Sequence, residues 1–341
     1  MGRINLWKNK SRIILLSLLV ISFLSGWSKR IYFPPLSPEK DYSIYFSPQD
    51  CLYPHLLSLI EEAKESIYAA FYKIELSEVA SGLIKAYQRG LEVKVLIDDL
   101  ACESKDSQYP YLCKFGIIKK DKEKESFMHH KFCIIDKKIV WTGSFNPTPR
   151  GVKENNNVII IKSVNLALEF IEEFEKLWDE KTSGESEEKE NLPVSIDETG
   201  IEVYFSPEDD CEEAILKELM KAKESIHFAL FSFTSPRIAS CLIHKYAENV
   251  EVKGIMERDQ DGPFSQYQYF KRLRMNVKWD GNFYFMHHKF FILDGRVVIT
   301  GSFNPTHHAR YKNRENLLII HNPTIAKKYE EEFVRMWRRG R

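Results

Sequence analysis

The feature that most constrains this chain is an internal duplication. Segments of the first half return almost unchanged in the second: AKESI at 63–67 and 222–226, FMHHKF at 127–132 and 285–290, and TGSFNPT at 142–148 and 300–306. Partners are 158 or 159 residues apart each time, so the two halves are colinear. This period is far longer than the roughly 20–50 residues of stacked solenoid repeats. Each half is therefore expected to fold as a complete unit.

Both halves alternate strand-like and helix-like segments. In the first half, strand-like runs occur at 44–47, 67–74 and 91–99, amphipathic helical patterns at 54–67 and 165–180, and a pair of strands at 129–144. The second half repeats this order. The pattern predicts an α/β fold: two tandem α/β sandwich domains with mixed sheets, related by a pseudo-twofold axis. We place these domains at 42–180 and 201–341, joined by a charged linker at 181–200.

The first 30 residues differ from the rest. Four cations precede an apolar run at 13–24, and Ser25, Gly26 and Trp27 follow it. A twelve-residue helix would span about 18 Å, well short of a hydrocarbon core of about 30 Å. Residues 1–30 are therefore predicted to be a signal peptide, with an uncleaved membrane anchor over 13–27 as the alternative. Either predicts export to the periplasmic or extracellular side.

Charge argues against a general nucleic-acid coat. The chain has 49 Lys and Arg and 49 Asp and Glu, and six of the cations lie in residues 1–30, which contain no acid. The remainder is therefore acidic on balance, whereas nucleic-acid coats carry a basic surplus. One local basic cluster stands out in the second half: Lys271, Arg272, Arg274 and Lys278. It suits either a nucleic acid or a solvated helix face.

Each half contains the pattern H-x-K-x4-D followed by G-S-x-N. The candidate catalytic residues are His129, Lys131, Asp136, His287, Lys289 and Asp294; the candidate substrate-binding residues are Ser144, Asn146, Ser302 and Asn304. Residues two apart in a strand point the same way, so each His and Lys share one face, while His130 and His288 face the other way and are expected to be structural. An imidazole beside a fixed cation suits an anionic phosphoryl group. Two such pairs suffice for a two-step transfer through a phosphohistidine without metal, while the two Asp residues are expected to fix local geometry.

This pattern resembles the HKD motif of the phospholipase D superfamily. Both copies match completely, and the duplication covers residues 42–341. The compact halves are most similar to the branch that includes a bacterial secreted endonuclease and the mitochondrial cardiolipin hydrolases. The resemblance implies phosphodiester hydrolysis or transfer at the interface of the two halves, with no cofactor and no metal. Because both motifs are in one chain, a monomer is sufficient.

The two halves differ at one position of interest. Members of the family often carry Glu about 28 residues after the motif His, and Glu315 stands there after His287, whereas the first half offers Asn156. A carboxylate that is hydrogen-bonded to an imidazole raises the pKa of the imidazole more than an amide does. If each residue serves the His of its own half, His129 is the neutral nucleophile and His287, paired with Glu315, is the acid. Family precedent also makes the amino-terminal His the nucleophile.

Cys102 and Cys113 bracket a polar loop that has no cysteine counterpart in the second half. In an exported chain they are the best candidates for a local disulfide, and zinc is the weaker alternative because no C-x-x-C or His pair stands nearby.

Two classes of substrate and one non-enzymatic role fit the sequence. A phospholipase D-type hydrolase would cleave the head-group phosphodiester of a phospholipid, and a membrane anchor would favour this substrate. An endonuclease is the alternative, and a phosphatidyltransferase is a further one. A binding protein with a decayed site is disfavoured because all six positions of both motifs are intact.

Overall fold

The computed structural model describes residues 41–121, 125–179, 194–196 and 199–341. The predicted signal or anchor segment, 1–30, lies outside the described residues. Most of the predicted linker does so too, although strand β8 (Val194–Ile196) and the start of β9 (Thr199–Ser206) fall within 181–200. No helix in the described part of the chain is long and apolar enough to cross a bilayer. All described residues belong to one compact unit.

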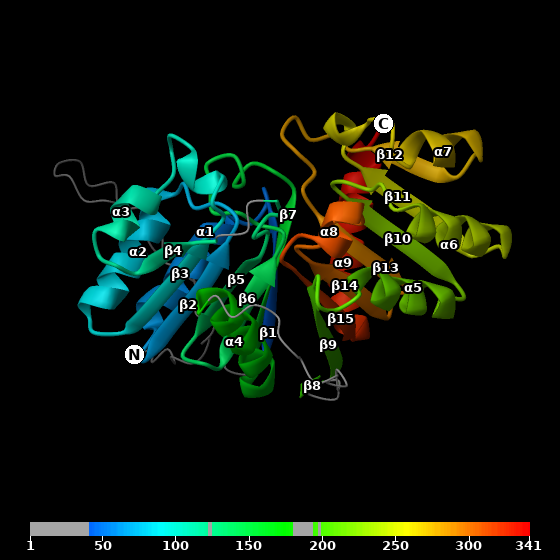
Figure 1. Cartoon of the computed structure of the whole chain (residues 1–341). Coiled ribbons are helices and arrows are strands. Elements are labelled where there is room, and N and C mark those ends of the chain that lie inside the picture. Colours follow the sequence, from blue (N-terminus) through cyan, green and yellow to red (C-terminus); the bar gives the residue numbers. More distant parts are fainter. Residues whose placement is uncertain (1–40, 122–124, 180–193, 197–198) are drawn as a thin grey trace, which may run out of the picture. The chain divides into compact units, whose positions relative to one another are not determined.

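The first half is built on a seven-stranded mixed sheet, drawn in blue to green in Figure 1. Its strand order is β1-β7-β6-β5-β2-β3-β4. The elements are β1 (Tyr42–Ser47), α1 (Leu52–Glu62), β2 (Ser66–Phe71), α2 (Ser77–Gln88), β3 (Glu92–Ile97), a 3-10 turn (Ala101–Glu103), α3 (Tyr109–Cys113), β4 (Ile118–Lys120), β5 (Lys131–Ile135), β6 (Ile139–Gly143), β7 (Asn156–Lys162) and α4 (Val164–Trp178). β2, β3 and β4 are parallel, and the other pairs are antiparallel.

The second half repeats this topology in an eight-stranded sheet, because β8 adds one strand at its edge. The order is β12-β11-β10-β13-β14-β15-β9-β8. After β9 come α5 (Cys211–Lys221), β10 (Ser225–Leu230), α6 (Pro236–Ala247), β11 (Glu251–Met256), a 3-10 turn (Arg258–Gln260), α7 (Tyr267–Arg272), β12 (Asn276–Trp279), β13 (Lys289–Leu293), β14 (Val297–Gly301), α8 (His307–Tyr311), β15 (Glu315–His321) and α9 (Pro323–Arg339). The predicted pair of α/β units with mixed sheets is confirmed.

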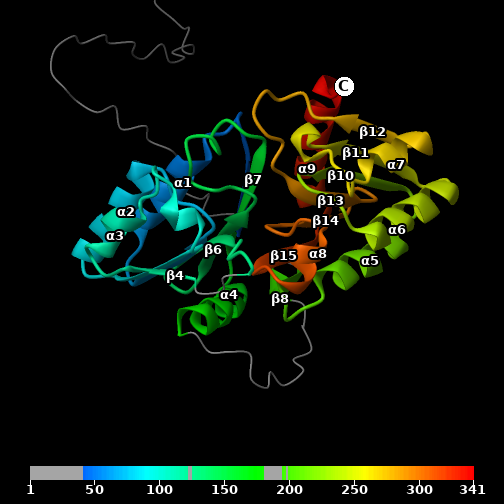
Figure 2. The ribbon, with the colours of Figure 1, turned by 45° about the horizontal axis from the view of Figure 1, so that its top comes forward.

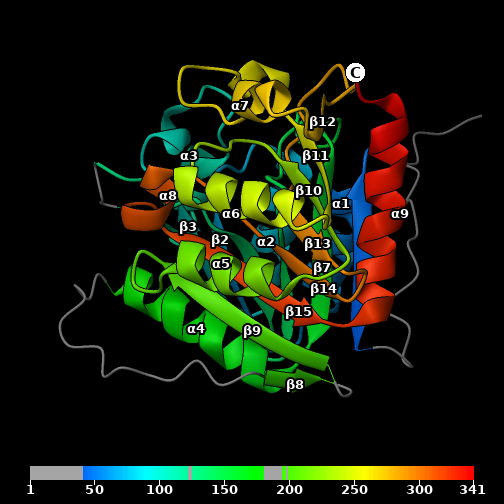
Figure 3. The same cartoon turned by 90° about the vertical axis from the view of Figure 1, so that its right-hand side faces the viewer.

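Each sheet is covered by helices on its outer face. In Figure 2, α1 and α2 lie on the outer side of the first sheet, and in Figure 3, α5 and α6 lie over the second. Each outer layer buries its own apolar cluster. The inner faces of both sheets instead share one cluster, which also takes in apolar residues of α4 and α9. The two halves therefore fold around a common core.

The helices α4 and α9 contribute apolar residues to this shared core. Both begin with a capping side chain: Ser163 accepts from the backbone N–H of Leu166, and Asn322 accepts from that of Ile325. Their buried residues recur every three or four positions, which puts them on one face. This face also reaches the opposite half, because α4 packs on β9 and α9 packs on β1.

Polar residues also cross the shared core in a buried network. The Asn157 side chain donates to Thr300 Oγ1 (2.9 Å) and to Tyr329 Oη (3.1 Å), and its Oδ1 faces His288 Nδ1 (3.0 Å). The counterpart Asn316 donates to Thr142 Oγ1 of the first half (2.9 Å). Buried amides tolerate few alternative partners, so these bonds fix how the two halves dock.

Gly143 and Gly301, which end β6 and β14, hold the motif turns in place. Both have positive φ, +152° and +145°. A Cβ at either position would lie 2.2 Å from a backbone carbonyl oxygen, of Asn157 or Asn316 respectively. The close approach of β6 to β7, and of β14 to β15, therefore requires glycine.

We expect Gly143→Ala to lower the free energy of unfolding by on the order of 3 kcal/mol, because the methyl group meets backbone rather than a movable side chain. Gly262→Ala is the control, since nothing lies within 4 Å of the added Cβ, and it should change stability by less than about 0.5 kcal/mol. Urea unfolding of both variants decides this. Equal stabilities would contradict the packing described here.

Candidate active site

The two motif histidines lie just before β5 and β13, where the two halves meet. The backbone N–H of His129 donates to Arg314 O (2.9 Å), and that of His287 donates to Asn155 O (2.9 Å). Neighbouring backbone bridges join Met128 to Arg314 and Asn155 to Met286. Each motif loop is therefore attached to the half that it does not belong to.

The histidine side chains cross in the same way. His129 Nδ1 lies 2.8 Å from Glu315 Oε2, and His287 Nδ1 lies 2.9 Å from Asn156 Oδ1. The pairing inferred from the sequence, Glu315 with His287, is therefore wrong. Spacing along the chain places Glu315 at the start of β15, but the pseudo-twofold docking turns that strand end toward the other half's histidine.

Hydrogen bonding sets the tautomer of His287. Its Nδ1 faces two acceptors, Asn156 Oδ1 and the backbone oxygen of Ser144 (3.0 Å), so Nδ1 carries the proton. The Asn156 amide is oriented by its own Nδ2, which donates to Gly151 O (3.1 Å). Glu315 plays the same part for His129. Both histidines thus keep Nε2 available for chemistry.

Lys131 and Lys289 flank these histidines. Each Nζ donates to the backbone oxygen of its motif histidine, two residues earlier, at 2.6 Å. Each also lies over an aromatic ring, Tyr72 at 5.4 Å and Phe231 at 4.8 Å. Both lysines are buried, with at most 2% of their surface exposed. Two ammonium groups therefore border one small site.

Burial dominates the titration of this site. Burial lowers the pKa of Lys131 to about 7, and burial with the neighbouring Lys131 lowers that of Lys289. Burial and both lysines hold the pKa of His129 and of His287 well below the usual range. Burial also raises the pKa of Glu315 to about 7. Because an anion would offset the desolvation of these cations, phosphate binding should be accompanied by proton uptake.

The serines of the G-S-x-N turns are already engaged. Ser144 Oγ donates to Asn156 Oδ1 (2.9 Å) and accepts from the backbone N–H of Asn157 (3.0 Å). Ser302 Oγ accepts from that of Asn316 (2.9 Å). Ser144 thus holds the amide that faces His287, and Ser302 holds the backbone next to Glu315, so contact between these hydroxyls and a substrate stays a prediction.

The two asparagines of these turns differ from each other. Asn304 Oδ1 accepts from the backbone N–H of Ser232 (3.3 Å). Asn146 Oδ1 is buried and has no hydrogen-bond partner among the described residues. Asn146 is thus the turn residue with unused hydrogen-bonding capacity, and its predicted contact with substrate remains open.

Asp136 and Asp294 lie away from the histidines. Each directly follows β5 or β13, whereas the motif lysine begins that strand, so a strand of about 17 Å separates them from the site. Asp136 accepts from the backbone N–H groups of Lys64, Glu65 and Ser66, and Asp294 makes the equivalent three bonds. They fix a turn at the far end of the sheet, and the structure does not bring them to the reacting atoms.

The structure adds two acids that sequence reasoning missed. Asp98 follows β3 and accepts from the backbone N–H of Met128 (3.1 Å), while Glu257 follows β11 and accepts from that of Met286 (2.7 Å). Each is buried and holds the residue before a motif histidine. The available signal was an acid directly after the third strand of each half, at equivalent positions.

Aromatic side chains surround the motif histidines. The Tyr72 ring packs against His129 (5.1 Å) and Phe127 (5.7 Å). In the second half, Phe231 packs against His287 (4.7 Å) and Phe285 (5.5 Å). Two residues before Phe285, the ring of Phe283 is 95% exposed.

The adjacent histidines, His130 and His288, face the other side of the sheet. Their Nε2 atoms pair with Glu173 of α4 (3.1 Å) and Glu332 of α9 (3.3 Å). Both imidazoles are fully buried. This agrees with the structural role expected of residues that alternate with the motif positions along a strand.

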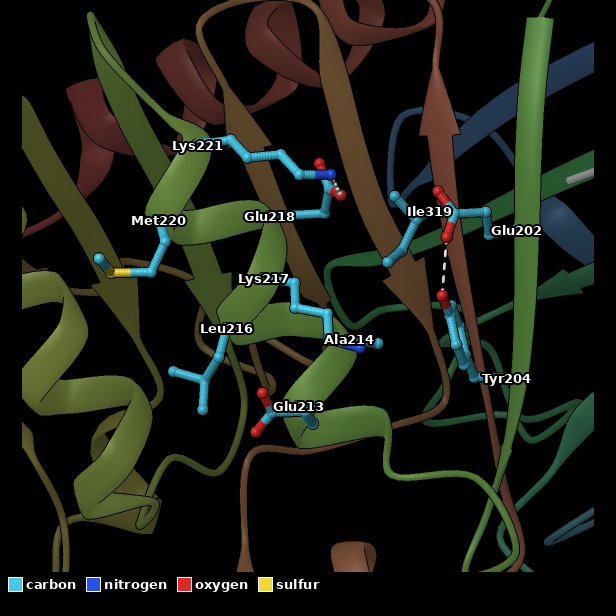
Figure 4. Close-up of a pocket in the computed structure, with 10 residues that line it drawn as sticks. All are labelled: Glu202, Tyr204, Glu213, Ala214, Leu216, Lys217, Glu218, Met220, Lys221 and Ile319. Carbon is cyan, nitrogen blue, oxygen red and sulfur yellow. Dashed lines mark hydrogen bonds and ion pairs between the residues drawn. The ribbon is translucent and has the colours of Figure 1, made fainter. Parts of the chain in front are cut away.

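A surface pocket lies elsewhere in the second half, between α5, β9 and β15 (Figure 4). Glu202, Glu218 and His321 offer ligand atoms within 4.8 Å of one another there. Glu202 already pairs with His321 (3.0 Å) and accepts from Tyr204 Oη (2.7 Å), and Glu218 accepts from Lys221 Nζ (2.5 Å). These contacts form an ion-pair network that accounts for the cluster without a metal. None of the residues lining the pocket belongs to the motifs.

The expected disulfide between Cys102 and Cys113 is absent: both are free thiols. Cys102 is buried in the 3-10 turn after β3, where its thiol donates to Asp99 O (2.9 Å), whereas Cys113 is exposed at the end of α3. Short spacing alone did not orient the two side chains toward each other.

Comparison with known proteins identifies the family. The family model described as "Cardiolipin synthase, PLD-like domain" matches residues 56–178 and 215–337, once in each half. The two matches together cover more than half of the chain.

Two relatives found by sequence match less than half of this chain. The mitochondrial cardiolipin hydrolase of Xenopus laevis is 34% identical over 157 residues, which are 43% of this chain and 74% of that protein. The phospholipase D of Rickettsia conorii is 30% identical over 135 residues, 39% of this chain and 68% of that protein. The solved phosphatidylserine synthase of Haemophilus influenzae Rd KW20 shares the fold across both halves, with a TM-score of 0.69, 14% identity, and coverage of 88% of this chain and 87% of that one. The chain therefore belongs to the phospholipase D superfamily and carries one PLD-like domain in each half.

Proposed function

We propose that this chain is a phospholipase D-type phosphodiesterase that hydrolyses phospholipid head-group esters through a phosphohistidine. The observation that carries this proposal is that each motif histidine is bonded to a residue of the other half, His129 to Glu315 and His287 to Asn156. Each Nδ1 is held by a residue of the opposite half, which leaves two Nε2 atoms for a substrate between two buried lysines. One chain supplies both histidines, so a monomer is sufficient.

The reaction has two balanced steps. The proton uptake that accompanies phosphate binding protonates His287 at Nε2. In the first step, the Nε2 lone pair of His129 attacks phosphorus, the bond from phosphorus to the leaving oxygen breaks, and the His287 imidazolium gives its Nε2 proton to that oxygen. In the second, His287 takes a proton from water as the water oxygen attacks phosphorus, and the phosphorus–nitrogen bond breaks. His129 is then free again, and phosphatidic acid and the head-group alcohol are the products.

The observed pairing gives a new physical reason for the nucleophile. Attack on phosphorus makes the His129 imidazole cationic while its Nδ1 proton is shared with Glu315. A carboxylate stabilises that charge, as the aspartate does in a Ser-His-Asp triad. His287 has neutral acceptors at Nδ1 instead, so its imidazolium gives up a proton more readily. His129 thus remains the proposed nucleophile, although the argument from the sequence was wrong.

The surroundings of the site favour phospholipid over nucleic acid. Aromatic rings line both motif histidines, and the exposed Phe283 is four residues from His287. The two curated relatives are named as a cardiolipin hydrolase and a phospholipase D. The basic cluster gives the endonuclease alternative less support, because Lys278 is only half-exposed and donates to Trp337 O (3.0 Å).

The remaining assignments accompany this proposal. Residues 1–30 would direct the chain across a membrane or anchor it there, which would place the enzyme beside lipid on the periplasmic or extracellular side. The domain limits stay at 42–180 and 201–341.

The substrate class is tested by assaying the purified chain in a chelator on phospholipid vesicles and on single- and double-stranded nucleic acid. We expect release of head group and formation of phosphatidic acid, with no loss in chelator, because two lysines already neutralise the phosphate. Cleavage of nucleic acid alone would favour the endonuclease. A phosphatidyl ester formed with an added alcohol would indicate transfer, and activity restored only by a divalent ion would refute the metal-free mechanism.

Replacing either buried lysine should weaken the transition state. We expect Lys131→Met and Lys289→Met each to lower kcat/KM by about 10²–10³-fold, as when one preorganised donor is removed. The exposed Lys85 of α2 provides the control variant, Lys85→Met, which should keep its rate. Because the pKa of Lys131 is about 7, its cation is lost as pH rises through that value, and kcat/KM should fall above it. Full turnover in either buried variant would mean that phosphate binds elsewhere.

The two histidines should behave differently with a substrate whose leaving group needs no proton. In His287→Asn, we expect the adduct to form on His129 and to persist, because no base activates water. In His129→Asn, no adduct should form. Mass spectrometry of acid-labile adducts locates the modified residue, and a stable adduct on His287 would reverse the assignment.

A further inference from the structure

The two halves contain the same pair of residue types in opposite order. Positions 154 and 156 are Glu and Asn, whereas the equivalent positions 313 and 315 are Asn and Glu. The second member of each pair contacts a motif histidine, and the first lies behind it: Asn313 Nδ2 donates to Glu315 Oε1 (3.4 Å), and Asn156 Nδ2 donates to Glu154 Oε2 (3.4 Å). Each histidine is thus followed by two hydrogen-bonded groups. His129 contacts a carboxylate that is backed by an amide, and His287 contacts an amide that is backed by a carboxylate.

Glu154 is buried, with 7% of its surface exposed. Oε1 pairs with Arg150 Nε (3.3 Å), and the guanidinium of Arg150 lies over the ring of Phe285 (3.5 Å). The Asn156 amide between Glu154 and His287 has no freedom to turn, since Nδ2 faces the acceptors Gly151 O and Glu154 Oε2 while Oδ1 faces His287.

We propose that Glu154 is a positioning residue for His287, which it acts on through the amide of Asn156. Together with Gly151 O, it keeps the amide oxygen on His287 Nδ1, which favours the tautomer with Nε2 toward the substrate. Its negative charge also acts on His287 from behind the Asn156 amide, without direct contact between the carboxylate and the imidazole. This inference rests on the proposed function only for its consequence in turnover.

Specific charged groups surround Glu154 and His287. Burial lowers the pKa of His287, Lys289, Lys131 and His129 lower it further, and the hydrogen bond to the Ser144 backbone raises it. Burial raises the pKa of Glu154, while the hydrogen bond from Asn156 and the cations Lys289, Arg150 and Lys73 act in the opposite direction. The two lysines disfavour protonation of His287, and the proposed role of Glu154 is to oppose them through the Asn156 amide, in addition to the hydrogen bond to the Ser144 backbone. Glu154 does so less than Glu315 does for His129, which leaves His287 the more acidic imidazolium.

Three variants separate charge from orientation. Glu154→Gln keeps an acceptor for Asn156 but removes the charge. Glu154→Asn shortens the side chain and removes both functions. The exchange Glu154→Asn with Asn156→Glu copies the order of the second half and puts a carboxylate directly on His287. Glu213→Gln is the control, because Glu213 is exposed and pairs with Arg237.

The primary measurement is ¹⁵N NMR of histidine-labelled protein, which reports the tautomer and pKa of His287 without turnover. We expect the Nδ1-protonated tautomer in the original chain and in Glu154→Gln, with a lower pKa in that variant. Glu154→Asn should lower the pKa as well and weaken the preference for that tautomer, which Gly151 O and the backbone oxygen of Ser144 still support. The exchanged pair should raise the pKa by on the order of one pH unit. An unchanged pKa and tautomer of His287 in all three variants would overturn the inference.

Turnover adds a second readout. The alkaline limb of kcat should move to lower pH in Glu154→Gln, with a fall of about tenfold at pH 8, and to higher pH in the exchanged pair. Glu213→Gln should match the original chain. If the chain lacked phosphodiesterase activity, the NMR result would still decide the role of Glu154, so the two failures are distinguishable. If the NMR pKa of His287 shifted but the alkaline limb of the pH profile of kcat did not, His287 would not be the residue that protonates the leaving group.

Discussion

The hydrogen bond between His129 of the first half and Glu315 of the second is the contact on which the architecture of the site depends. It exists only if the start of β15 reaches the motif loop before β5. The backbone bond from His129 to Arg314 places that loop, and the reciprocal bonds of His287 do the same on the other side. The site is therefore a product of docking between the halves, and each half separately provides a histidine without its partner.

Docking of this accuracy needs more than apolar burial. The shared core of α4, α9 and the inner sheet faces supplies most of the driving force, but apolar surfaces tolerate sliding. Asn157 and Asn316 limit that freedom because their buried amides each have partners in the other half. The network is not perfectly symmetric: His130 Nδ1 and Asn316 Oδ1 are buried and have no hydrogen-bond partner in the described part of the chain, whereas the equivalent atoms of His288 and Asn157 are bonded to each other. The second-half histidine is thus the more firmly held.

Much of this could be predicted from the sequence. The duplication and the alternation of strands and helices gave two α/β units, and the period of two along each motif strand placed Lys131 with His129 and turned His130 away. The partners of the histidines could not be found in this way, because the 28-residue spacing to Glu315 says nothing about which half the strand end will face. Asp98 was missed because one acid after a strand looks like any surface residue. The disulfide failed because the spacing of Cys102 and Cys113 carries no information on side-chain direction.

The crosswise contacts have a consequence for how changes in the chain combine. The residues that work together are His129 with Glu315, and His287 with Asn156, so each working pair contains one member from each domain. A substitution in the second domain thereby alters the chemistry of the first domain's histidine, and the reverse. Exchange of a whole domain with that of a relative would replace one member of both pairs at once, even if the incoming domain folded well. The functional unit is therefore the pair of residues, one from each domain. It does not coincide with either domain, which is the unit of folding.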